Sequence, residues 1–315
     1  MLLVDELPHN ALRVCATLFG LIWGSFLNVV IYRSPRGLSV VRPGSQCPVC
    51  HKPIRAWNNI PVVSWLVLRG KARCCGVKVS PRYPIVEALG GAASLAVLEL
   101  VVFAMPEATV LRAAAVYVTD FAAILGLIAA AFIDLEFMYL PDAVTLGGTV
   151  LGIMTSSFRG MTIAGSLVTA VIGFLVAYIP FVFLYRMVRG RAGMGLGDAK
   201  LLMMAGAFFG LIGIAWTLLA GAVQGTLGAF VLWLLRGKIE LPQGVKEELA
   251  ELRKLASEGD AEAKAILAED PLAEEDAEGQ TFARMAFGPF LALAFIEHVL
   301  FGPVIVEYAR QMFFL

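Results

Sequence analysis

Four acidic residues lie within or at the ends of long apolar stretches, where an ionisable side chain is costly and usually functional. Asp134 ends one stretch and Asp198 opens another, directly after three glycines spaced within 193–197, while Asp120 and Glu99 lie deeper in theirs. Two carboxylates at one depth on different helices can share a proton, so that one activates a water and the other protonates a scissile carbonyl. The glycines would let the backbone beside Asp198 approach an extended substrate. The pattern is compatible with an aspartic protease.

Structural roles for the same residues remain open at this point. Asp134 and Asp198 are also suited to the polar ends of helices, and Asp198 to the positive end of a helix dipole. Asp142 follows a proline, which favours an N-terminal helix cap. Asp120 is more typical of a residue hydrogen-bonded to a neighbour inside a bundle, and Glu99 of one that pairs or faces a cavity.

Cysteines form the second group of residues that could carry chemistry. Cys47 and Cys50 are a Cys-x-x-Cys pair, and Cys74 and Cys75 follow after 23 residues. Two cysteine pairs in a reducing compartment favour a zinc knuckle over disulfides. Adjacent cysteines strain simultaneous ligation, so His51 is an alternative ligand. Free thiols in a basic loop are the other interpretation.

The elements that position these residues are membrane helices. The chain has 315 residues, of which 59% are hydrophobic and 16% charged, and the mean hydropathy is +0.78. These values exclude an intrinsically disordered chain and argue against a soluble globule. We expect an all-α polytopic membrane protein with about eight spans of mostly apolar residues: 11–32, 85–105, 110–133, 142–158, 161–187, 198–212, 214–235 and 285–309.

Charge sets the expected orientation. Residues 33–84 hold ten Lys and Arg and no Asp or Glu, so this loop should be cytoplasmic and both termini should face outward. Residues 237–283 hold thirteen acidic and five basic residues. Within them, 245–267 has the apolar spacing of one or two amphipathic helices. The formal net charge of zero is therefore a balance between a basic membrane protein and one acidic insertion.

Several motifs extend over nearly the whole chain except the acidic insertion. They are Gly24-Ser-Phe-Leu-Asn-Val-Val-Ile-Tyr-Arg33, the Cys-Pro-x-Cys element, Asn59-Ile-Pro61 with Ser64-Trp-Leu66, Arg82-Tyr-Pro84 followed by Glu87, Phe132-Ile-Asp134 with Leu140-Pro-Asp142, Gly193-Met-Gly-Leu-Gly-Asp-Ala-Lys200 and Phe287-Gly-Pro-Phe-Leu291. In type and in order, these motifs resemble those of type IV prepilin peptidases.

The resemblance implies a bifunctional enzyme of the bacterial inner membrane with a cytoplasmic-facing active site. It would cut the basic leader from type IV prepilins or type II secretion pseudopilins, and would then methylate the new N-terminal residue with S-adenosylmethionine. Asp134 and Asp198 match the two catalytic aspartates of this family of GxGD proteases. The supporting residues implied by the resemblance are Asp142, Gly195, Gly197 and Lys200.

One departure from the family concerns the zinc ligands. The family pattern resembles two Cys-x-x-Cys pairs, and its third cysteine falls on Ala72 of this chain. The predicted Zn²⁺ ligands are Cys47, Cys50, Cys74 and Cys75, with Cys74 replacing the missing residue. The methyl-transfer region is expected near Gly24, Asn28, Arg33 and Glu87, because the family pattern associates this part of the chain with the second activity.

These expectations divide the chain into five parts: a first span at 1–32, a basic zinc-type domain at 33–84, a protease core at 85–236, an acidic and partly helical insertion at 237–283, and a last span at 284–315. The partners would be prepilins, pseudopilins and the lipid bilayer, with no nucleic acid. The competing interpretations are an ion-coupled transporter that uses Asp120, Asp134 and Glu99, and a non-catalytic assembly scaffold. The acidic insertion either concentrates basic leaders or is a solvated segment with no substrate role.

Overall fold

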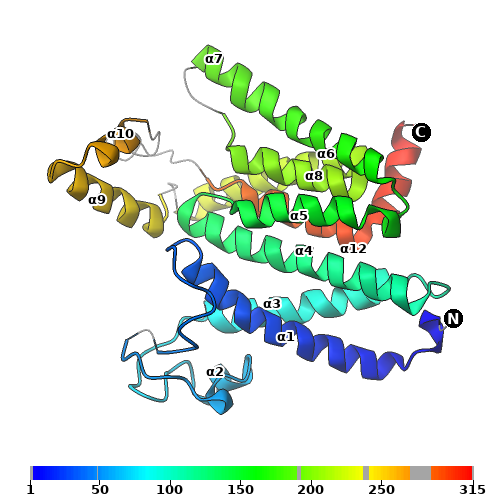
Figure 1. Ribbon diagram of the computed structural model, residues 1–315, viewed down its shortest axis with the longest axis horizontal. Helices are drawn as coiled ribbons and strands as arrows, with labels where there is room; N and C mark the ends of the chain where they lie inside the picture. Colours follow the sequence, from blue (N-terminus) through cyan, green and yellow to red (C-terminus); the bar gives the residue numbers. More distant parts are fainter. Residues whose placement is uncertain (1–2, 48, 190–192, 237–240, 270–284, 314–315) are drawn as a thin grey trace. The chain divides into compact units, whose positions relative to one another are not determined.

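The computed structural model describes residues 3–47, 49–189, 193–236, 241–269 and 285–313 of the chain (Figure 1). The described residues form helices and loops with isolated β-bridges and no strands, which confirms the predicted all-α class. The chain divides into two compact units. The first comprises 1–129, 157–160 and 299–307, and the second comprises 130–156, 161–298 and 308–315.

The first unit is built on a close pair of helices, α1 (His9–Arg33) and α3 (Arg82–Val97), with α3 continuing as the π-helix η3 (Leu98–Val102). Small residues line their contact, since a Cβ at Gly90 would lie 2.8 Å from the Cα of Gly24. Ser94 donates to the carbonyl of Ala16 across the pair at 2.5 Å. The first part of α4 (Val110–Phe137) also belongs to this unit.

The loop between α1 and α3 is the basic segment predicted to carry the metal site. It contains the short 3₁₀-helix η2 (Ala56–Asn58) and the short helix α2 (Val63–Val67). Two antiparallel bridges, Gln46 with Pro53 and Lys71 with Lys78, close the two turns that carry the cysteines. Hydrogen bonds within these turns give the loop its fixed shape, because it has few buried apolar residues.

The second unit contains the end of α4, then α5 (Asp142–Met154), α6 (Ile163–Ala177), η5 (Tyr178–Leu184), α7 (Tyr185–Arg189), α8 (Leu196–Arg236) and most of α12 (Gly288–Phe313). Hydroxyl groups of α6 bind carbonyls of α8: Ser166 donates to Ala207 at 2.7 Å and Thr169 to Gly206 at 2.7 Å. Such hydrogen bonds join helices where lipid offers no polar partner.

Among the described residues, six helical stretches are long and apolar enough to cross a membrane: His9–Arg33, Arg82–Val102, Val110–Phe137, Ile163–Val188, Leu196–Leu235 and Gly288–Gln311. The fourth predicted span is the shorter apolar helix α5. Predicted spans six and seven form the single element α8, which has 41 residues and a non-helical residue at Gly210 with φ 70° and ψ −155°. A straight helix of that length would extend about 60 Å, about twice the hydrocarbon thickness. The break lies where the sequence predicts a division, and the number of crossings stays a prediction.

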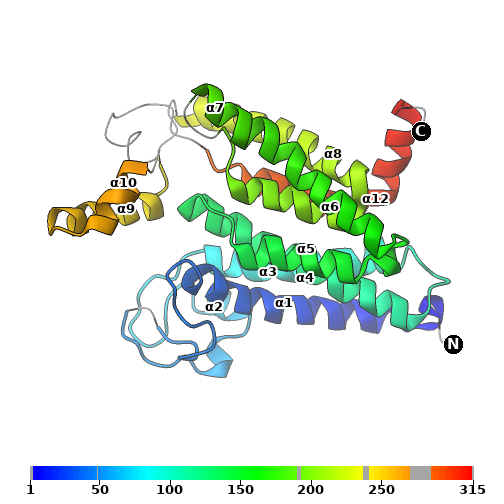
Figure 2. The same cartoon turned by 45° about the horizontal axis from the view of Figure 1, so that its top comes forward.

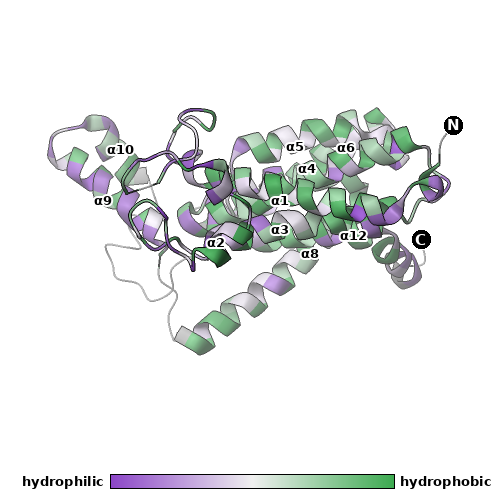
Figure 3. Cartoon of the chain, turned by 90° about the horizontal axis from the view of Figure 1, so that it is seen from below, coloured by the Kyte–Doolittle hydropathy of each residue, from purple (hydrophilic) through white to green (hydrophobic). Residues whose placement is uncertain are grey.

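The described part of the acidic insertion contains two helices, α9 (Gln243–Ser257) and α10 (Ala261–Glu269), as the amphipathic pattern predicts. The residues 237–240 and 270–283 of this predicted segment lie outside the described part of the chain. Val245 and Leu249 of α9 are buried and contact Met138 and Leu267. The helix is therefore anchored to the end of α4 rather than fully solvated. In Figure 3, most of α9 and α10 has the purple colour of hydrophilic residues.

Candidate functional site: two aspartates and a cysteine cluster

Asp134 lies in the last turn of α4 and is buried, with 5% of its surface exposed. Its carboxylate accepts a hydrogen bond from the backbone N–H of Gly288, the first residue of α12. A Cβ atom at position 288 would lie 2.6 Å from Asp134 Oδ2, so only glycine leaves room for this contact. The N-terminal end of α12 thus presents a backbone donor, with its partial positive charge, to the Asp134 carboxylate.

Asp198 lies in the first turn of α8 and is partly buried. The backbone N–H of Gly195, which precedes the helix, donates to its carboxylate. Asp134 and Asp198 are close enough for their charges to repel each other. The structure therefore brings together the two residues that the family resemblance pairs, each with one glycine N–H as a donor.

Leu140 contacts the glycines beside both aspartates. A Cβ at Gly197 would lie 3.0 Å from the Cβ of Leu140, and a Cβ at Gly288 would lie 2.8 Å from its Cδ2. Leu140 itself is buried and belongs to the link between α4 and α5. This apolar side chain therefore lies beside the backbone of a glycine next to each aspartate.

Asp142 and Lys200 form an ion pair, with Lys200 Nζ 2.5 Å from Asp142 Oδ1. The predicted helix-cap role of Asp142 is wrong, because Pro141 occupies the N-cap position and Asp142 is the first residue of α5. Since Lys200 is two residues after Asp198, the pair connects the start of α5 to the start of α8. Both residues lie beside the aspartate pair without contacting it through any described hydrogen bond.

The other two acids of the apolar stretches each have an arginine partner. Asp120 Oδ1 lies 3.2 Å from Arg159 Nη2, and Glu99 Oε1 lies 2.5 Å from Arg13 Nε. These contacts confirm the interpretation of Asp120 as bonded to a neighbour and of Glu99 as paired. Carboxylates held in this way serve the packing of the first unit.

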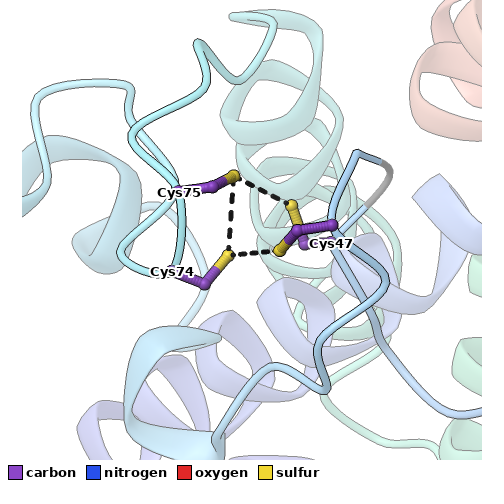
Figure 4. Close-up of side chains that lie close together, drawn as sticks. Cys47, Cys74 and Cys75 are labelled. Atoms are coloured by element: carbon purple, nitrogen blue, oxygen red, sulfur yellow. Dashed lines mark hydrogen bonds between the residues drawn. The ribbon is translucent and has the colours of Figure 1, made fainter.

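The four cysteines of the basic loop gather in one cluster, with their sulfur atoms within 4.8 Å of one another. Cys47 Sγ lies 3.6 Å from Cys75 Sγ, and Cys50 Sγ lies 3.3 Å from Cys74 Sγ. Figure 4 shows the sulfur atoms pointing toward a common centre. Zinc bound to four thiolates at about 2.3 Å requires sulfurs roughly 3.8 Å apart, so this donor set fits a tetrahedral metal ion. His51 is not part of the group.

The thiols of this cluster differ in acidity. The backbone N–H groups of Cys50 and Val49 donate to Cys47 and lower its pKa to about 6. The hydrogen bond with Cys50 and the effect of burial raise the pKa of Cys74 to about 12. A thiolate that already accepts backbone hydrogen bonds is prepared for a metal cation.

Three of the four residues of the expected methyl-transfer region meet where α1 contacts α3. A Cβ at Gly24 would lie 2.8 Å from the Cα of Glu87, and Asn28 Nδ2 donates to the carbonyl of Tyr83 at 3.1 Å. Glu87 Oε2 accepts from the backbone N–H of Val62 at 2.6 Å.

Arg33 has a different role from those three residues. Its guanidinium donates to the carbonyls of Ser39, Pro43 and Gly44, at 3.0, 2.7 and 3.3 Å. It thereby holds the start of the basic loop in shape, and among the described residues it makes no hydrogen bond to Glu87.

Gly288 contacts Asp134, and Leu140 packs against Gly197 and Gly288, and the sequence alone predicts no role for either residue. Both belong to motifs that carry the family resemblance, namely Phe287-Gly-Pro-Phe-Leu291 and Leu140-Pro-Asp142. The two motifs therefore mark these residues in the sequence. The sequence does not show that the Gly288 N–H lies close enough to Asp134 to donate to it.

The fold and these sites define a multi-pass helical membrane protein with two aspartates at helix ends and a tetracysteine cluster. The family described as Bacterial Peptidase A24 N-terminal domain matches residues 18–101, and the Type IV leader peptidase family matches residues 121–233. The chain belongs to the type IV leader peptidase family, as its motifs predict.

Curated relatives named prepilin leader peptidase/N-methyltransferase are similar over most of their length. The protein of Stutzerimonas stutzeri is 34% identical over 76% of this chain and 88% of its own. That of Myxococcus xanthus is 33% identical over 90% of this chain and 88% of its own. That of Aeromonas hydrophila is 36% identical over 75% and 87%. No solved structure matches the chain.

Proposed function

We propose that this protein removes the leader peptide of type IV prepilins and pseudopilins and then methylates the new N-terminal residue. Family membership and the names of the curated relatives support both activities. The observation that carries the peptidase assignment is the aspartate pair, in which the two carboxylates repel each other and each accepts one glycine N–H.

In the proposed reaction, Asp134 and Asp198 hold one proton between them because two adjacent negative charges are unfavourable. The ionised carboxylate takes a proton from a water molecule while the oxygen of that water attacks the scissile carbonyl carbon. The protonated carboxylate donates to the carbonyl oxygen. Collapse of the intermediate breaks the C–N bond, and a proton passes to the leaving amine.

The glycine donors position the carboxylates for this step. The Gly288 N–H donates to the Asp134 carboxylate and the Gly195 N–H to the Asp198 carboxylate, and these bonds would orient both groups toward water and substrate. Leu140, which is buried and packs against Gly197 and Gly288, would limit the access of bulk water to the pair. The Asp142–Lys200 ion pair is the proposed support that holds the starts of α5 and α8 in register.

The orientation is proposed from charge. The basic loop and the aspartate pair would face the cytoplasm of a bacterial inner membrane, where the basic leader of a prepilin remains while its apolar segment lies in the bilayer.

The same side would bind S-adenosylmethionine, the methyl donor. S-adenosylmethionine would supply an electrophilic methyl group, which a sulfonium carries. Asn28 Oδ1 is buried without a hydrogen-bond partner among the described residues, so Asn28 and Glu87 are the groups we propose to hold it.

The cysteine cluster is the proposed Zn²⁺ site, with Cys47, Cys50, Cys74 and Cys75 as ligands. A bound zinc ion would supply a structural cross-link to a loop with little apolar core. We place no reaction step at this metal.

One experiment tests the peptidase and the methyltransferase together. The purified protein is mixed with a synthetic prepilin and S-adenosylmethionine, and mass spectrometry measures loss of the leader and gain of a methyl group. Asp134→Asn and Asp198→Asn should each abolish leader loss, whereas Glu136→Gln on the same helix should retain it. Cleavage by both aspartate variants would refute the assignment. The transporter alternative requires Asp120-dependent transport in vesicles, and the scaffold alternative requires pilus assembly by both aspartate variants.

A further inference from the structure

The basic loop of the first unit has an apolar surface that no other described part of the chain covers. We define the α2 patch as Trp57, Ile60, Val63, Leu66 and Val67. Trp57 is 82% exposed, Val67 74% and Leu66 60%. In Figure 3, α2 is hydrophobic while the loops around it are hydrophilic. A clustered apolar surface of this kind marks an interaction site.

One tryptophan of α2 points in the opposite direction and fixes the orientation of the helix. Trp65 donates its indole N–H to the carbonyl of Val79 at 3.1 Å, and its ring lies against Gly70. Because Trp65 faces the loop, its neighbours Leu66 and Val67 face outward. The exposure of the α2 patch is therefore set by hydrogen bonding and packing on the inner side of α2.

One hydrogen bond joins the start of α2 to the membrane-length helix α3. The N–H of Val62, immediately before α2, donates to Glu87 Oε2 at 2.6 Å. Glu87 lies in the second turn of α3, which begins at Arg82 and is apolar enough to cross a membrane. The start of α2 is thus held at the level of the first turns of a membrane-crossing helix. Figures 1 and 2 show α2 among the loops at the end of the first unit where α1 ends and α3 begins.

The charges around the α2 patch favour an anionic surface. Residues 33–84 contain ten Lys and Arg and no acidic residue. Four of these basic residues are close in sequence to the patch: Arg55, Arg69, Lys71 and Arg73. Basic side chains beside exposed tryptophan and aliphatic residues are typical of segments that lie in the headgroup region of a membrane with anionic lipids.

We propose that the α2 patch inserts into the headgroup region of the membrane that holds the chain, and that the neighbouring Lys and Arg contact anionic lipid phosphates. The bilayer surface then supports the cysteine-bearing loop from one side, while Glu87 supports it from the other. The inference does not depend on which residues cleave or methylate. A protein partner on the same patch is the competing occupant that the experiment must separate.

The test uses the full chain reconstituted in vesicles of phosphatidylcholine with or without phosphatidylglycerol. Some of the lipid carries bromine either near the headgroup or near the end of the acyl chain. The chain has five tryptophans, so the contribution of Trp57 is the difference between the parent protein and Trp57→Phe. We expect this difference fluorescence to be quenched by bromine near the headgroup, more strongly with phosphatidylglycerol, and less by bromine at the chain end. Absence of quenching from both positions would overturn the proposal and leave the patch to a protein partner.

A second measurement covers the aliphatic part of the α2 patch. In the double variant Leu66→Glu/Val67→Glu, the loop should leave the membrane surface, so quenching of Trp57 should be lost and trypsin should cut the loop faster. Val41→Glu is the matched control, because Val41 is 76% exposed in the same loop but outside the patch. Metal content, measured in parallel, shows whether the cysteine cluster remains folded. Equal quenching in the double variant and the control would also overturn the proposal.

Discussion

The backbone N–H of Gly288 donates to the carboxylate of Asp134, and a Cβ at position 288 would lie 2.6 Å from Asp134 Oδ2. The two residues come from helices far apart in the sequence. This contact explains why the start of α12 belongs to the aspartate site: the helix end supplies a donor that holds the carboxylate without adding a side chain.

Gly288→Ala should therefore impair leader cleavage while the protein remains folded. The added methyl group would collide with Asp134 Oδ2 and with Leu140 Cδ2, because the distance from a Cβ at position 288 to Leu140 Cδ2 would be 2.8 Å. We expect the cleavage rate to fall at least about tenfold, equal to about 1.4 kcal/mol of barrier. Gly147→Ala in α5 is the matched control, since a Cβ there meets nothing within 4 Å. Equal rates for the two variants in the mass assay would exclude steric control of Asp134 by position 288.

The Asp142–Lys200 ion pair should contribute modestly. Asp142 is 59% exposed at its side chain, and solvent and salt weaken such a pair to about 1 kcal/mol or less. Lys200→Met should lower the cleavage rate about two- to fivefold, with a smaller difference from the parent protein at high salt. The exchange Asp142→Lys/Lys200→Asp should recover part of the loss. If the exchange variant loses as much cleavage activity as the two single variants predict when their effects are added, the ion pair is not the relevant interaction.

The docking of α9 on the end of α4 should influence the aspartate site. Leu249 is 1% exposed and contacts the region of Met138, whose N–H donates to the carbonyl of Asp134 at 2.8 Å. Leu249→Glu would bury an unpaired charge, at a cost on the order of 2 kcal/mol or more. We expect α9 to detach, with faster proteolysis at Arg253 and slower leader cleavage.

The control for α9 is Leu255→Glu, because Leu255 lies on the same helix and is 38% exposed. It adds the same charge without removing a buried contact, so both readouts should match those of the parent protein. Normal cleavage by Leu249→Glu together with rapid proteolysis would show that the docked helix has no effect on the aspartates.

The cysteine cluster predicts metal binding by this chain despite Ala72. Cys74→Ser and Cys75→Ser should each lower the zinc content from about one ion per chain, because each replaces one of four thiolate donors. Cys15→Ser in α1 is the control, since Cys15 is outside the cluster. The measurement is metal analysis of the purified full chain. Unchanged zinc in Cys74→Ser would assign the ion to three cysteines and a different fourth ligand.

Several features of the fold could be predicted from the sequence because they depend on local patterns. Apolar stretches predict the helices that are long enough to cross a membrane, and the separate predicted spans 198–212 and 214–235 place a division close to the break at Gly210 in α8. The amphipathic spacing predicts α9 and α10. The buried face of α9 was not predicted, because the same spacing fits a helix on any apolar surface and its partner, Met138, is distant in the chain.

The sequence by itself determined the class of protein and the family, since hydropathy is a property of each residue and the motifs are read in order. The tertiary structure alone decided how those residues meet. It showed that Cys74 lies 3.3 Å from Cys50 despite the altered spacing, that Lys200 pairs with Asp142, and that Gly288 donates to Asp134. Hydrogen bonds and ion pairs need atoms within about 3 Å, and only the packing of distant helices brings such atoms together.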